Sequence, residues 1–280
     1  MKMKTLHSLL GVSILALVGS IAGAGSANAA VTVSNGDLYL GFRATGGTGS
    51  SFDYLIDIGQ ASIYKNATSS FVLNSASGIN IGNIGIDLAN TFGANWATRS
   101  DLFWGVVGTV NPLIGTDPLN TEYASKGENT FGTPETAWNS RANSAQNQTN
   151  TAIVTLRTTL SNDTAAPNST RAAIQSTGEA GSWFSAVHAA DGGGVSFNSS
   201  YDSSLEGSFA GGPNGTALDL FRLPVSASGA AGTYLGNFTT DSTGNITFNV
   251  ASVPEPSTLT ALAGGAALLG LVRRRRSAIA

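Results

Sequence analysis

The chain has 280 residues, a formal net charge of −3 and no cysteine, which excludes disulfides, thiolate nucleophiles, zinc–thiolate sites and iron–sulfur clusters. When the basic ends are set aside, residues 30–253 hold 8 Lys and Arg against 16 Asp and Glu, a net charge of −8. An acidic region without clustered basic residues gives no support for nucleic-acid binding.

The N-terminal segment has the three parts of a secretory signal peptide. Lys2 and Lys4 form a positive region, residues 9–21 are apolar, and Ala27-Asn28-Ala29 is a small-x-small cleavage site. We therefore expect signal peptidase to remove residues 1–29. An uncleaved N-terminal anchor is the alternative, which the short apolar run and the well-formed cleavage site disfavour.

Apolar residues at every second position predict β-strands along the exported region, residues 30–252. The predicted strands are Asp37–Arg43, Phe52–Gly59, Ile84–Leu88, Leu102–Val110, a run through Val195, Phe197 and Tyr201, Leu218–Leu223, Tyr234–Thr240 and Ile246–Val250. Leu102–Val110 is apolar on both faces, which is typical of a central strand. The glycine-containing connection Asp241–Asn245 predicts that the last two strands form a hairpin.

A helical pattern interrupts the strands between residues 133 and 175. Thr133-Pro134-Glu135 combines a cap, an N1 proline and a first-turn acid, which predicts a helix start. Further on, Ile153, Leu156 and Leu160 recur as on an amphipathic helix, and the polar stretch Asn139–Asn150 predicts a loop. The predicted fold is mainly β, a sandwich or jelly-roll-like ectodomain of two sheets with one short helical insertion.

Catalytic candidates are few, and for each of them a structural role is the favoured interpretation. His188 is the only histidine of the exported region and has no second imidazole or Gly-x-Ser-x-Gly motif beside it. The pairs Asp53/Asp57 and Asp202/Glu206 are the candidates for glycosidase chemistry, but solvated carboxylates explain them more simply. We therefore predict no catalytic residue and a non-enzymatic protein.

No cofactor and no metal is predicted, with calcium as the one alternative left open. The oxygen-rich turns Asp191–Gly194 and Asp241–Asn245 could supply calcium ligands, yet neither has the spacing of an EF-hand or of a nonapeptide repeat. A sugar-binding module would use aromatic platforms, for which the sequence offers the tyrosines and four tryptophans. These tryptophans are Trp96, Trp104, Trp138 and Trp183. Most of these aromatic residues fall on strand faces, which favours a place in the core.

The C-terminus has three elements in a fixed order. Pro254-Glu255-Pro256 is a stiff, extended segment, because each proline fixes its own φ and disfavours helix at the preceding residue. A single membrane helix follows, and then a basic cluster that resists translocation and places the last residues, 277–280, in the cytoplasm. The anchoring residues are Leu259, Leu262, Leu268, Leu269, Leu271 and Val272, and the cytoplasmic stop is Arg273, Arg274, Arg275 and Arg276. The 16 residues 257–272 span only about 24 Å as a helix, less than a hydrocarbon core of about 30 Å, which suits a temporary anchor.

This order of elements over residues 253–276 resembles the PEP-CTERM sorting signal of exported bacterial proteins. The resemblance implies that an exosortase, a membrane-embedded enzyme similar to cysteine transpeptidases, recognises Pro254, Glu255 and Pro256. It also implies a link to exopolysaccharide production. Gly36–Arg43, Leu205–Phe209 and Tyr234–Phe238 look like parts of ectodomains that accompany this tail, and they imply no activity. A plain single-pass anchor that is never processed is the alternative for the tail.

These observations predict an exported protein, held at the inner membrane as a precursor and then released to the cell surface or the extracellular space. Its expected partners are signal peptidase, an exosortase, the inner membrane and an extracellular polysaccharide. The first hypothesis for its function is a non-enzymatic surface or matrix protein. A carbohydrate-binding module is the second hypothesis, and a polysaccharide hydrolase is the third.

Overall fold

The computed structural model describes residues 29–110, 117–188, 201, 203–211, 216–225 and 229–251. Its ten strands, within these residues, form a single antiparallel sheet. The strands are β1 (Asp37–Ala44), β2 (Phe52–Gln60), β3 (Phe71–Val72), β4 (Leu102–Thr109), β5 (Glu122–Gly127), β6 (Ala172–Ser176), β7 (Gly207–Ser208), β8 (Leu218–Leu223), β9 (Thr233–Thr240) and β10 (Ile246–Val250). The helices are α1 (Ala61–Lys65), α2 (Ile84–Phe92) and α3 (Asn143–Asn162), with short turns of other helix types at η1 (Trp96–Thr98), η2 (Phe184–His188), η4 (Ser203–Leu205) and η5 (Phe209–Gly211).

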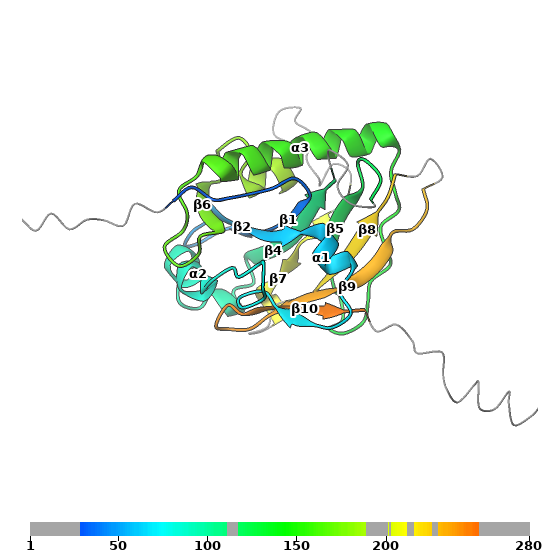
Figure 1. Ribbon diagram of the computed structural model, residues 1–280. Coiled ribbons are helices and arrows are strands. Elements are labelled where there is room, and N and C mark those ends of the chain that lie inside the picture. The colour runs from blue at the N-terminus through cyan, green and yellow to red at the C-terminus, as the bar shows by residue number, and fades with distance from the viewer. Residues whose placement is uncertain are drawn as a thin grey trace, which may run out of the picture.

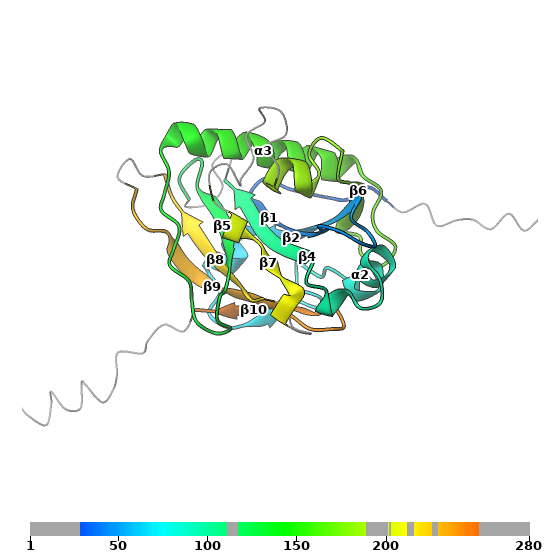
Figure 2. The same cartoon turned by 180° about the vertical axis from the view of Figure 1, so that it is seen from behind.

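The sheet curls into a half-barrel, with the strand order β3-β10-β9-β8-β5-β4-β1-β2-β6 and β7 beside β4 (Figures 1 and 2). The mainly β character predicted from alternation is confirmed. The expected pair of stacked sheets is wrong, because β5 pairs with both β4 and β8 and so joins all the strands into one ladder. Curling lets one sheet enclose its own apolar face, as a second sheet would do in a sandwich.

Each face of the sheet carries its own apolar core. The inner core is rich in aromatic rings such as Phe42, Trp104, Phe238 and Phe248, and α1 and α2 add residues to it. The outer core lies under α3, which crosses the sheet in Figure 1. The predicted apolar stripe of α3 is confirmed there, since Ile153, Leu156 and Leu160 are all buried.

The strand predicted at Ile84–Leu88 is wrong, because these residues begin helix α2. Ile84 and Leu88, four positions apart, are buried together, whereas Ile86 is exposed. That is a helical spacing, and alternating apolar residues over only five positions also fit it. Asp87, also on the buried side, accepts a hydrogen bond from the Tyr54 hydroxyl at 2.9 Å.

The predicted start of the long helix is also wrong, since α3 begins at Asn143 rather than near Thr133. Glu135 serves the preceding loop instead: its carboxylate accepts from the amide of Asn129, and its own amide donates to Asp219. The stretch predicted as a loop is largely helical because its polar side chains are bonded inside the fold. Gln146, for example, donates to the carbonyl of Leu223 at 3.0 Å.

Two parts of the predictions concern residues outside those described. Val195 and Phe197 are among them, and Tyr201, which is described, lies in no strand. The predicted membrane helix also lies outside. Among the helices of the described ranges, none combines the length and the apolar character that a bilayer crossing requires.

Candidate functional site

The described part of the chain ends directly after β10, a strand that is hydrogen-bonded within the sheet. Strand β10 pairs with β9 from Ile246 to Val250, which confirms the predicted hairpin. The amide of Ala251 still donates to the carbonyl of Leu235 at 3.0 Å. Residue 252 therefore follows directly on a hydrogen-bonded segment. The sorting residues from Pro254 onward lie outside the described residues, as does Ala27 of the predicted signal peptidase site.

The N-terminal end of the described chain is also tied to the fold. The carbonyl of Ala29 accepts a hydrogen bond from the amide of Ala165 at 3.0 Å, and Ala30 forms a β-bridge with Thr164. Val31 is buried in the outer core beneath α3. The predicted cleavage point, the bond after Ala29, thus lies next to backbone that the fold holds by hydrogen bonds.

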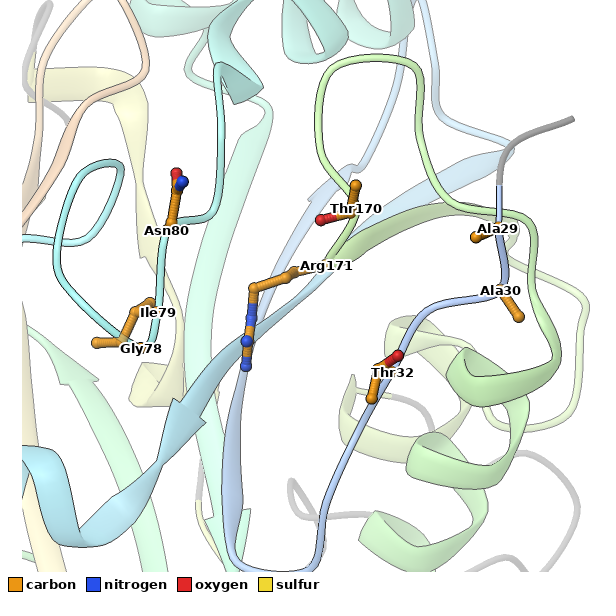
Figure 3. A pocket seen from close by; sticks show the side chains of 8 residues that line it. All are labelled: Ala29, Ala30, Thr32, Gly78, Ile79, Asn80, Thr170 and Arg171. Carbon is orange, nitrogen blue, oxygen red and sulfur yellow. The ribbon is translucent and has the colours of Figure 1, made fainter. Parts of the chain in front are cut away.

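A groove runs beside this N-terminal segment. Its larger part, about 440 Å³, is enclosed by the segment itself, the loop around Asn80 and the turn at Thr170 and Arg171 (Figure 3). A smaller part of about 190 Å³ shares Thr32, Gly78 and Arg171 with it and reaches Asp37 and Asp57. The groove brings together three segments that are far apart in the sequence.

An ion pair forms the floor of the groove. Arg171 Nη2 lies 2.7 Å from Asp57 Oδ2, and Arg171 Nε donates to the Asp57 carbonyl at 3.0 Å. The amide of Gly59 donates to Asp57 Oδ1 at 2.7 Å. Burial raises the pKa of Asp57 to about 7, and the charge of Asp37 adds to this rise, while Arg171 opposes it.

Asp37, the second carboxyl group of the groove, is also held by fixed partners. It accepts hydrogen bonds from the amide of Ser34 at 2.6 Å and from the side chain of Gln60. Burial raises its pKa, against the opposing effect of these bonds. All four oxygens of the two carboxyl groups are thus occupied by partners within the protein. The two acids of the groove therefore act as anchors of the fold.

Of the two carboxylate pairs singled out in the sequence, the described residues include both members of one, Asp53 and Asp57, and these two bind separate partners. Asp53 and Asp57 are both buried on β2, but Asp53 Oδ2 accepts from the amide of Phe184 at 2.7 Å, whereas Asp57 binds Arg171. Glu206 forms an ion pair with Arg43. Asp202, its predicted partner, lies outside the described residues.

His188 belongs to the network around that ion pair. Its Nδ1 lies 3.0 Å from Arg43 Nη2 and 3.3 Å from Glu206 Oε2, and Trp183 Nε1 donates to Glu206 Oε1 at 2.8 Å. Burial opposes the ionisation of Glu206, but the bonds from His188, Arg43 and Trp183 hold its pKa below the ordinary value. The network ties η2 to β1.

Three of the four tryptophans are too deeply buried to serve as the binding platforms of the second hypothesis. Trp96, Trp104 and Trp183 are at most 2% exposed and lie in the two cores. Trp138 is partly buried, and the Lys126 ammonium lies 4.5 Å from the centre of its ring. The most exposed large apolar side chain of the described residues is instead Phe131, at 65%. It lies in a polar loop without periodicity, so no sequence pattern marked it.

In the turn Asp241–Asn245, the carboxylate of Asp241 is hydrogen-bonded to other residues of the same turn. Asp241 Oδ1 accepts from the amides of Thr243 and Asn245, and Oδ2 accepts from the Asn245 side chain. Its companion, Asp191–Gly194, lies outside the described residues. Within the ranges that the structure covers, no group of three or more His, Asp or Glu is placed to hold a metal.

Comparison with known proteins identifies the tail rather than the domain. No curated protein and no solved structure matched the chain. Residues 252–276 match the family model of the PEP-CTERM protein-sorting motif, which indicates an exported protein that is targeted to an exosortase. The match begins one residue after Ala251, where the described part of the fold ends. The chain therefore carries the sorting motif of PEP-CTERM proteins at its C-terminus.

Proposed function

We propose that this chain is a non-enzymatic surface protein of the extracellular matrix, released from the inner membrane by an exosortase and retained by an extracellular polysaccharide. The sorting motif at residues 252–276 is the observation that carries the proposal. The position of β10 supports it, because processing next to Pro254 would leave the sheet complete through Val250.

The described domain supports a non-catalytic role through its use of ionisable groups. Two buried carboxylates, Asp57 and Glu206, bind arginines that hold strands and turns together. A hydrolase needs one carboxyl group facing a substrate with a proton to give and a second facing the same bond. Asp53 and Asp57, the candidate pair that the structure describes in full, bind Phe184 and Arg171 instead of facing a common site.

The test compares three forms of the chain in a host that contains an exosortase. The intact chain should yield a mature form without Arg273–Arg276 at the cell surface. A chain lacking residues 254–280 should be secreted into the medium as a folded domain. A chain with Pro254→Ala and Pro256→Ala keeps its anchor and should accumulate uncut in the membrane fraction.

Mass spectrometry of each fraction gives the outcome. The same distribution for all three chains, or a surface form that retains the arginine peptide, would refute exosortase processing. If washing with polysaccharide-degrading enzymes did not release the mature form, retention by a matrix polysaccharide would be wrong while the processing step would stand.

A further inference from the structure

A second hollow, distinct from the groove at Arg171, lies where the loop after β5 meets the β9–β10 hairpin. Its volume is about 220 Å³. Phe131 supplies its only aromatic ring, and the remaining lining residues carry hydroxyl, carboxyl or amide groups. These residues are Thr239, Thr240, Asp241, Asn245 and Thr247. The aromatic ring of Phe131 thus lies next to a set of polar groups.

The loop that carries Phe131 is held at three points. Glu128 Oε2 accepts from the amide of Gly132 at 2.6 Å, and Glu135 Oε1 accepts from the amide of Asn129 at 2.7 Å. Glu128 Oε1 also accepts from the side chain of Asn237 on β9 at 2.7 Å, which fastens the loop to the sheet. The backbone that carries Phe131 is fixed in this way, so a ligand that stacks on the ring does not have to order the loop.

The polar side of the hollow retains free hydrogen-bonding capacity. The Thr247 hydroxyl makes no hydrogen bond within the described part of the chain, and the Thr239 hydroxyl accepts one bond, from Asn249 at 3.2 Å. Thr239 and Thr247 are opposite each other on β9 and β10, so their side chains project from the same face of the sheet. Asp241 Oδ2 accepts a single bond, from Asn245, and can accept another.

We infer that this hollow binds one ring of a neutral hexose, as a unit of a polysaccharide. A pyranose has a face of C–H groups that can stack on Phe131 and a rim of hydroxyl groups that can both donate and accept. Asp241 accepts from such a rim, and the hydroxyls of Thr239 and Thr247 do both. The inference rests on the proposed function and deepens it, because it gives the matrix protein a place to hold its polysaccharide.

The test uses the full-length chain in a detergent that contains no sugar headgroup. Saturation-transfer NMR is recorded with the methyl glycosides of glucose, galactose and mannose as probes. We expect transfer to at least one of them, strongest at the C–H protons of the stacked face. Phe131→Ala should weaken that binding about tenfold or more. Thr247→Val, which keeps the shape but removes the hydroxyl, should also weaken it.

Phe52→Ala is the matched control, since Phe52 is an exposed phenylalanine that does not line the hollow. This variant should bind as the unmodified chain does, and circular dichroism should show the same folded signal for all forms. No transfer to any of the three glycosides, or binding that Phe131→Ala leaves unchanged, would overturn the inference. Either result would leave the processing of the tail intact, because that is read by fractionation.

Discussion

The indole ring of Trp183 lies directly against the backbone of Gly41, in the middle part of β1. A β-carbon added at Gly41 would come within 2.0 Å of Trp183 Cδ2, so only glycine fits at this point of the strand. The contact fixes η2 and the Arg43–Glu206 pair over the sheet. It also explains why a glycine interrupts an otherwise bulky strand, since it makes room for the ring.

Gly41→Ala should therefore destabilise the domain through overpacking, by about 1–3 kcal/mol. Urea denaturation followed by tryptophan fluorescence measures the free energy of unfolding. Gly178→Ala is the matched control because a β-carbon there meets no atom within 4 Å. Equal stability of the two variants would show that Trp183 moves aside without cost.

Glu206→Gln should cost more stability than a comparable change at the surface. It leaves the buried guanidinium of Arg43 without its counter-charge, a loss of about 3–5 kcal/mol. Asp101→Asn breaks the pair with Arg99 at a carboxylate whose side chain is 37% exposed, and should cost about 1 kcal/mol or less. Thermal or urea unfolding of both variants checks the ranking, which would be contradicted by a larger loss for Asp101→Asn.

The strands that could be predicted from the sequence are those with an apolar face turned to a core. β1, β2, β8, β9 and β10 have such a face, and β4 is apolar on both faces. β5 was missed because it buries polar groups: Glu122 accepts a hydrogen bond from Tyr201, and Ser125 donates to the carbonyl of Leu205 at 2.7 Å. Such partners come from distant segments, so the strand resembles a polar loop when only its own sequence is read.

Of the candidate sites, too, only the one whose residues are neighbours in the sequence could be predicted. The sorting motif is local, with its three elements consecutive in the chain, and so the sequence alone was enough to identify it. The groove depends on Thr32, Asp57, Gly78 and Arg171, which only the folding of β2 beside β6 and the N-terminal segment brings together. No spacing rule connects residues so far apart.

Stability should increase when the pH is lowered from 7.5 to 5. Burial raises the pKa of Asp57, Glu122 and Asp219 to about 7. Between their unfolded and folded pKa values, the folded protein binds more protons than the unfolded chain, so its stability falls as the pH rises. Each fully protonated group contributes about 1.4 kcal/mol per pH unit at most.

Melting temperatures between pH 3 and 8 provide the measurement. Glu122→Gln imitates the protonated acid permanently and should flatten the rise between pH 7.5 and 5. Below about pH 4 the trend should reverse, because Asp117 and Glu206 have lowered pKa values, so that protonation there removes their ion pairs. A melting temperature that increased steadily up to pH 8 would contradict this account.

Arg171→Met should destabilise the protein more at pH 8 than at pH 5. At pH 5 Asp57, with a pKa of about 7, is largely protonated and needs its arginine less. At pH 8 the variant must either bury the Asp57 carboxylate without its cation or keep Asp57 protonated at a pH well above its ordinary pKa. Both alternatives cost free energy. Arg99→Met is the control, because the hydrogen bond from Arg99 lowers the pKa of Asp101 against the opposing effect of burial, and Asp101 stays ionised at both pH values. Its loss of stability should be the same at pH 5 and pH 8, whereas a pH-independent loss for Arg171→Met would show that Asp57 is ionised throughout this range.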